Sequence, residues 1–156
     1  RTNLVSKHMY DIKITPEILK TFDQAERIAL IGTGGNLAVC QHMASDIYRH
    51  TGKFCFAPDS VNQTALGGDG DWKEPWLKYA QTSSDLIIAV TCRIASPLIK
   101  ILEKTPANVI VLAPQQHSVM PTVVIPSVTY HEYECKALWT LYMLMEENGV
   151  QLPRLK

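Results

Sequence analysis

The chain has 156 residues, of which 46% are hydrophobic and 19% are charged, and its formal net charge is zero. A neutral chain has no electrostatic basis for binding nucleic acid or an anionic membrane, and no apolar run approaches the roughly 20 residues that cross a bilayer. We therefore expect one soluble cytoplasmic domain with reduced thiols, because its four cysteines form no Cys-x-x-Cys pair.

The N-terminal part of the chain predicts a short helix, a buried strand and a long helix. A proline at the first position marks the short helix, which we expect over residues 15–25. The apolar run 28–31 is short and ends at glycine, as is typical of a parallel strand. Three glycines within 32–35 then give a tight turn, and Asn36 is the expected N-cap of a helix over 37–50.

This strand, turn and helix are typical of an anion-binding site. The backbone N–H groups and the dipole of the helix N-terminus point at whatever lies above the sheet, usually a phosphate or a carboxylate. The candidate binding residues are Thr33, Gly34, Gly35 and Asn36. The spacing is neither Gly-x-Gly-x-x-Gly nor a Walker loop, so no nucleotide cofactor is expected. A tight turn without a ligand is the alternative.

His42 and Asp46 are four positions apart on the expected long helix, so both side chains project from one face. An imidazole and a carboxylate in this arrangement can bind a metal ion or move a proton. The alternative is an exposed pair without a chemical role.

The rest of the chain alternates strands and helices. We expect strands at 54–57, 85–91, 108–113 and 123–125, a loop at 61–71, and helices at 72–81, 96–104 and 130–148. Such alternation predicts a three-layer α/β/α sandwich around a five-stranded parallel sheet. In open sheets of this kind, ligands bind beyond the carboxyl ends of the strands. The glycine turn, the loop after Phe56 and the segment Thr91–Arg93 lie at that edge, and we expect them to form one pocket.

Three blocks of the chain resemble, in order and spacing, the sugar isomerase (SIS) family, and within it the phosphoheptose isomerases. The first is the turn 32–36 followed by His42 and Asp46, which is similar to the family's glycine loop and its helix His and Glu. The second is 67–71, before an aromatic helix, and the third is 131–139, which is similar to the family's closing helix.

The resemblance implies an SIS domain over 28–150, preceded by an N-terminal segment with a short helix (1–27) and followed by a tail (151–156). It also implies a homo-oligomer, a tetramer or a dimer, with a phosphosugar pocket at a subunit interface. The implied reaction is the aldose–ketose isomerisation of sedoheptulose 7-phosphate through an enediol. In the family a helix Glu is thought to act as the base and a closing-helix His as the acid.

The resemblance also assigns roles to residues of this chain. Asp46 lies at the position of the family's catalytic Glu, and His131 at that of a Gln. Trp139 lies at the position of the catalytic His and cannot serve as a proton donor at neutral pH. The candidate catalytic residues are therefore Asp46 and His131. Further candidates for binding the substrate and its phosphate are Asp69, Thr91, Arg93 and Ser96.

These departures from the family leave two functions open. In the first, His42, Asp46 and His131 form a three-ligand zinc site, and Asp46 or Glu132 moves the proton while the metal polarises the carbonyl group. In the second, the acid–base pair is lost and the chain is a non-catalytic SIS module that binds a phosphosugar or a protein partner. The fold alone does not decide between them.

Overall fold

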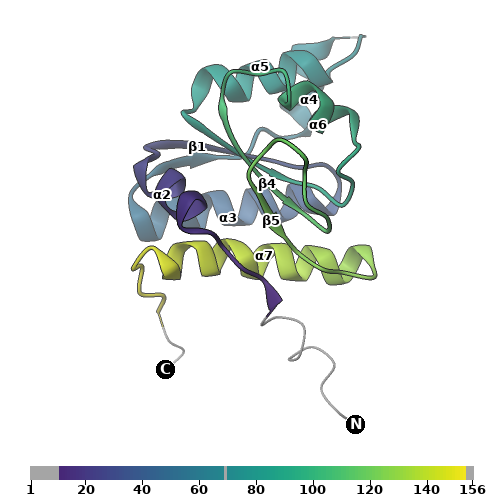
Figure 1. Ribbon diagram of the computed structural model, residues 1–156. Coiled ribbons are helices and arrows are strands. Elements are labelled where there is room, and N and C mark those ends of the chain that lie inside the picture. Colours follow the sequence, from purple (N-terminus) through teal and green to yellow (C-terminus); the bar gives the residue numbers. More distant parts are fainter. Residues whose placement is uncertain (1–10, 69, 154–156) are drawn as a thin grey trace.

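The computed structural model describes residues 11–68 and 70–153, and Figure 1 shows one sheet between two layers of helices. Within these residues five strands pair in parallel in the order β2–β1–β3–β4–β5. The strands are β1 (Arg27–Ile31), β2 (Phe54–Phe56), β3 (Leu86–Val90), β4 (Asn108–Ala113) and β5 (Thr122–Val124). The expected five-stranded α/β/α sandwich is confirmed.

Each face of the sheet has its own helical layer (Figure 1). One layer consists of α2 (Pro16–Gln24), α3 (Gly35–Thr51) and α7 (Tyr130–Glu147). The other consists of α4 (Ser60–Gly67), α5 (Lys73–Ser83) and α6 (Pro97–Leu102). No helix in the described part of the chain is both long and apolar enough to span a membrane.

The central strands show why the two layers form. Every residue of β3 is buried, as is typical of a parallel strand that is covered on both faces. Alternate side chains of this strand point to opposite faces. Ile88 therefore packs with α2, α3 and α7, whereas Ile87 and Ala89 pack with α5 and α6.

The N-terminal helix α2 forms as predicted and packs into the main core. The Thr15 hydroxyl accepts a hydrogen bond from the Ile18 N–H at 3.4 Å, and Pro16 occupies the first helical position. Ile18 and Phe22 are buried in the same hydrophobic cluster as α3 and α7. This helix therefore contributes to the core of the α/β unit.

The predicted loop at 61–71 was wrong in its first part, because residues 60–67 form α4. A capping box begins this helix: the Asp59 carboxylate accepts the Asn62 N–H at 2.9 Å, and Asn62 Oδ1 accepts the Asp59 N–H at 3.0 Å. No residue of α4 is buried. The helix consequently has no apolar stripe by which its sequence could have revealed it.

The start of α3 also differs from the prediction. Its N-cap is Gly34, which has a φ of +60°, and the helix begins at Gly35. Asn36 therefore lies inside the first turn, and its side chain is buried instead of capping the helix. Glycine is required at position 34 because other residues rarely adopt this backbone conformation.

Candidate functional site at the carboxyl ends of β1 and β3

The strand order creates a crevice between two neighbouring strands. β1 and β3 pair directly, but β1 leads into α3 on one face and β3 leads into α6 on the other. Ligands of open α/β sheets bind at such a switch point, outside the carboxyl ends of the strands. The segments 32–36 and 91–96 flank this crevice.

A pocket of about 290 Å³ lies at this crevice, on the side of α5 and α6. Three predicted binding residues, Thr33, Thr91 and Ser96, line it together. They come from two separate segments of the chain, so two of the three segments that were expected to form one pocket meet there. No described residue of the expected loop 61–71 lines the pocket; Trp72 and Lys73, which follow it, do.

The segment after β3 is held by hydrogen bonds. The Ser96 hydroxyl accepts the Ile99 N–H at 3.3 Å and caps α6. The Thr91 hydroxyl accepts the Arg93 N–H at 3.1 Å, and the Thr91 N–H donates to the Tyr133 hydroxyl at 3.0 Å. Burial raises the pKa of Tyr133, so its hydroxyl stays protonated and donates to the Leu112 carbonyl at 2.6 Å. These contacts fix the wall of the pocket before any ligand binds.

Lys73 is a pocket residue that was not predicted from the sequence. Its ammonium group lies 2.9 Å from Asp71 Oδ1 and 5.4 Å from the centre of the Trp72 ring. Hydrogen bonds from the Lys73 backbone N–H and then from its side chain lower the pKa of Asp71, which keeps this carboxylate charged. The run Asp71-Trp72-Lys73 at the start of a predicted helix is the feature of the sequence from which this pocket residue could have been predicted.

Two further predicted binding residues that the structure describes, Arg93 and Asn36, do not line this pocket. The Arg93 guanidinium donates to the Tyr130 hydroxyl at 3.1 Å. The Asn36 amide lies 3.5 Å from the Cys92 sulfur. Asp69 lies outside the described residues.

Glu134 on α7, which was also not predicted from the sequence, packs against the glycine turn. A Cβ atom on Gly35 would lie 2.1 Å from Glu134 Oε1, so any larger residue at position 35 would displace this carboxylate. Glu134 is half-buried and has no hydrogen bond or ion pair within the described residues. It faces the first turn of α3, where the helix dipole favours a negative charge. His131, exposed in the first turn of α7, is three positions before it.

The predicted pair of His42 and Asp46 does share one face of α3, and Tyr142 of α7 contacts both side chains. His42 Nε2 lies 3.4 Å from Asp46 Oδ2 and 3.0 Å from the hydroxyl of Tyr142 on α7. The Tyr142 hydroxyl donates a short hydrogen bond to Asp46. Burial first, and then this bond, raise the pKa of Tyr142 to about 12. Asp46 lies about three helical turns beyond Gly35.

The predicted zinc ligands are not gathered within one chain. Among the described residues, no three His, Cys, Asp or Glu side chains form a group that could hold a metal ion. His131 lies about three turns along α7 from Tyr142, and therefore from the His42–Asp46 pair. Within one chain His42, Asp46 and His131 therefore do not come together around a metal ion, and zinc binding by this protein stays a prediction.

The fold and this crevice define an α/β protein with a parallel sheet in the order β2–β1–β3–β4–β5, which is the architecture that the sequence resemblance implied. No protein-family model matches the sequence, and no curated protein matches it. Solved structures do match. Phosphoheptose isomerase GmhA from Neisseria gonorrhoeae superposes with a TM-score of 0.61 at 16% identity, over 79% of this chain and 76% of that one.

Two further structures show the same fold. A phosphoheptose isomerase from Francisella tularensis matches with a TM-score of 0.61 at 14% identity, over 82% of this chain and 78% of that one. The Vibrio vulnificus NanR protein complexed with ManNAc-6P matches with a TM-score of 0.61 at 17% identity, over 92% of this chain but 57% of that one. At these identities the similarity concerns the fold.

Proposed function

We propose that this protein binds a sugar phosphate at the β1–β3 crevice, with the phosphate in the pocket lined by Thr33, Thr91 and Ser96. The observation that carries the proposal is that these three hydroxyl-bearing residues, from two separate segments, meet in one pocket at the switch point. Hydroxyl groups donate hydrogen bonds to phosphate oxygens. The Ser96 hydroxyl accepts the Ile99 N–H and keeps its own proton for this purpose, whereas the Thr91 hydroxyl donates to the Arg93 carbonyl at 3.0 Å and would have to rotate.

Lys73 also lines this pocket, and lysine binds phosphate as a point charge. Its ammonium group is paired with Asp71 Oδ1 at 2.9 Å, so a phosphate would have to draw it from that carboxylate.

The pocket volume indicates how such a ligand would lie. Its 290 Å³ is just below the range of roughly 300–1,000 Å³ that is usual for small-molecule sites. It has room for a phosphate and part of the sugar. Gly32 and Thr33 line the pocket while Gly35, in the same turn, contacts Glu134. The pocket lies on the α5 and α6 side of this turn and Glu134 on the α7 side, so the remaining carbons would reach the Glu134 carboxylate only by crossing the glycine turn.

For an isomerase, this arrangement favours Glu134 as the proton-transfer group. A base must take a proton from the carbon beside the carbonyl group and return it to the adjacent carbon, while a second proton moves between the two oxygens through an enediol. Glu134 is without a partner in the described structure, whereas Asp46 accepts a hydrogen bond from Tyr142. His131, on the same helix face as Glu134, is the candidate for the second transfer.

A phosphosugar sensor without catalysis is the second candidate. The similarity to NanR, solved with ManNAc-6P, extends over 92% of this chain. Trp139, at the position of the family's catalytic His, is 43% exposed on α7 and supplies no acid. Binding without turnover is the outcome that distinguishes the sensor from the isomerase.

The test measures the thermal stability of the protein with sedoheptulose 7-phosphate, ManNAc-6P, inorganic phosphate and an unphosphorylated sugar. A ligand at a hundred times its Kd stabilises the folded state by about 2.7 kcal/mol. We expect stabilisation by a phosphorylated sugar and none by its unphosphorylated form. Equal effects of both, or none from any phosphate, would overturn the proposal. Product formation from sedoheptulose 7-phosphate then separates an isomerase from a sensor.

A further inference from the structure

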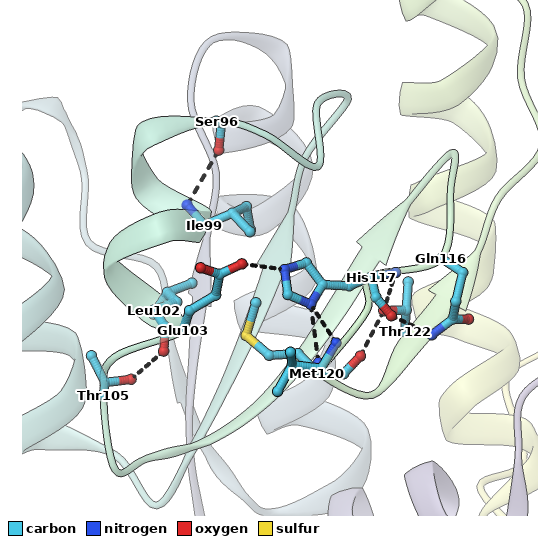
Figure 2. Close-up of polar contacts among 10 residues, drawn as sticks. Ser96, Ile99, Leu102, Glu103, Thr105, Gln116, His117, Met120 and Thr122 are labelled. Atoms are coloured by element: carbon cyan, nitrogen blue, oxygen red, sulfur yellow. Dashed lines mark hydrogen bonds and ion pairs between the residues drawn. The ribbon is translucent and has the colours of Figure 1, made fainter.

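His117, in the connection between β4 and β5, is 94% buried and uses both ring nitrogens (Figure 2). Its Nδ1 atom lies 3.1 Å from the backbone nitrogen of Val119 and 3.0 Å from that of Met120. Because both of these N–H groups donate, Nδ1 is the acceptor and the ring proton is assigned to Nε2. Nε2 then donates to Glu103 Oε1 at 2.8 Å.

The connection is also closed on itself, so His117 is fixed relative to the sheet. The His117 N–H donates to the Thr122 hydroxyl at 3.2 Å, and that hydroxyl donates to the Met120 carbonyl at 2.9 Å. Thr122 is the first residue of β5 and is buried. In Figure 2 the His117 ring, held by this network, points towards Glu103 at the end of α6.

Glu103 connects the network to the pocket. It directly follows α6, a helix of six residues that begins after its N-cap Ser96. Pro97, Leu98, Ile99 and Leu102 of this helix line the pocket, as does Ser96. Because α6 has only six residues, a displacement of its C-terminal end would also move the residues that line the pocket. The other charged groups beside Glu103 and His117 are Lys100 and Lys104, which line the adjoining surface groove.

We infer that the His117–Glu103 contact positions α6 and thereby sets the width of the phosphosugar pocket. This inference rests on the proposed function. His117 and Glu103 are positioning residues, since neither lines the pocket. The Glu103 side chain is 39% exposed, so its contact with the buried imidazole of His117 does not belong to the hydrophobic core.

The experiment compares Glu103→Ala with Glu103→Gln, whose side-chain carbonyl can still accept the Nε2 proton. Glu146→Ala, which removes an exposed carboxylate on α7, is the matched control. We expect Glu103→Ala to weaken sedoheptulose 7-phosphate binding about fivefold to tenfold, the effect of one lost hydrogen bond. Glu103→Gln and Glu146→Ala should bind within twofold of the wild type. Equal affinity in Glu103→Ala and Glu103→Gln would overturn the inference.

A second readout separates this inference from the proposed function. Amide hydrogen exchange at Ile99, whose N–H is held by Ser96, reports on α6 without any ligand. We expect faster exchange at Ile99 in Glu103→Ala alone, with the histidine ¹⁵N spectrum still showing the Nε2–H tautomer in Glu103→Gln. Unchanged exchange in Glu103→Ala would overturn the positioning role. If the wild type binds no phosphosugar while Ile99 responds, the proposed function fails but α6 is still positioned by Glu103.

Discussion

Asp46 and Glu134 are carboxylates of the same helical layer, but their surroundings differ. Asp46 accepts a hydrogen bond from Tyr142 and lies 3.4 Å from His42. Glu134 is half-buried against Gly35 and has no such partner among the described residues. Partial burial of a carboxylate without a partner costs free energy. A buried or partly buried polar group without a partner calls for an explanation, and a role in the chemistry is one. The comparison therefore favours Glu134 as the proton-transfer group over Asp46, the carboxylate that the sequence motif indicated.

The largest expected effect is on turnover. Glu134→Gln keeps the shape of the side chain against Gly35 but cannot accept a proton. If the protein is an isomerase, we expect kcat on sedoheptulose 7-phosphate to fall about 10²- to 10⁴-fold with KM within threefold. Asp46→Asn is the matched variant and should lose less than fivefold. A greater loss in Asp46→Asn would reverse the comparison and return Asp46 to the catalytic role.

The position of Glu134 can be disturbed without changing its chemistry. In Gly35→Ala the new Cβ would meet the end of the flexible Glu134 side chain at 2.1 Å, so the carboxylate has to move. We expect turnover to fall about 10- to 100-fold, since a misplacement near 1 Å has effects of this size. The unfolding free energy should hardly fall, because alanine is a better helix residue than glycine.

Gly34→Ala is the control for that variant. Nothing lies within 4 Å of a Cβ at this position, but its φ is +60°. We expect a loss of stability of about 1–3 kcal/mol from backbone strain, with Glu134 undisturbed. If Gly35→Ala leaves turnover unchanged while Gly34→Ala lowers stability as expected, the Glu134 carboxylate has no role in the chemistry.

The sequence predicted the fold well because buried parallel strands leave a local signal. The bounds of β4 were predicted without error, and continuous apolar runs marked β1 and β3. The helix α4 gave no such signal because it buries nothing, so its Gly- and Asn-containing sequence resembled a loop. Elements were therefore predictable where local composition reflects burial.

The site was predictable to a smaller extent. Thr33, Thr91 and Ser96 could be placed together because all three follow the carboxyl ends of parallel strands. The contact between Glu134 and Gly35 depends on how α7 packs on α3. The partnership of Asp46 with Tyr142 depends on the same packing of helices far apart in the sequence. No local pattern records either relationship.

Ser96 allows the phosphate side of the site to be separated from its structural role. Ser96→Ala should lower stability by about 1 kcal/mol through loss of the α6 cap, and should also weaken phosphosugar binding severalfold. Ser96→Asp keeps a good capping residue but adds a negative charge to the pocket, so stability should recover while binding falls about tenfold or more.

The control for these two variants is Thr15→Ala, which removes the corresponding cap from α2. Thr15 does not line the pocket. It should match Ser96→Ala in stability loss, measured by urea unfolding, and leave binding unchanged. Tight binding by Ser96→Asp would mean that the phosphate does not occupy this pocket.

The smallest expected effect concerns the partner of Asp46. The pKa of Tyr142 is raised to about 12, above the roughly 10 of an unfolded chain. The folded state therefore binds the phenol proton more tightly, and the resulting stabilisation is complete below about pH 10 and is lost as the pH rises through about 12. The difference in urea-unfolding free energy between the wild type and Tyr142→Phe should be constant near neutral pH and shrink in that alkaline window.

The buried Tyr133 is present in both proteins and cancels in the difference. A difference that stays constant at alkaline pH would show that Tyr142 does not hold Asp46. Asp46 and Glu134 would then both lack a partner, and the comparison would no longer favour Glu134 as the base.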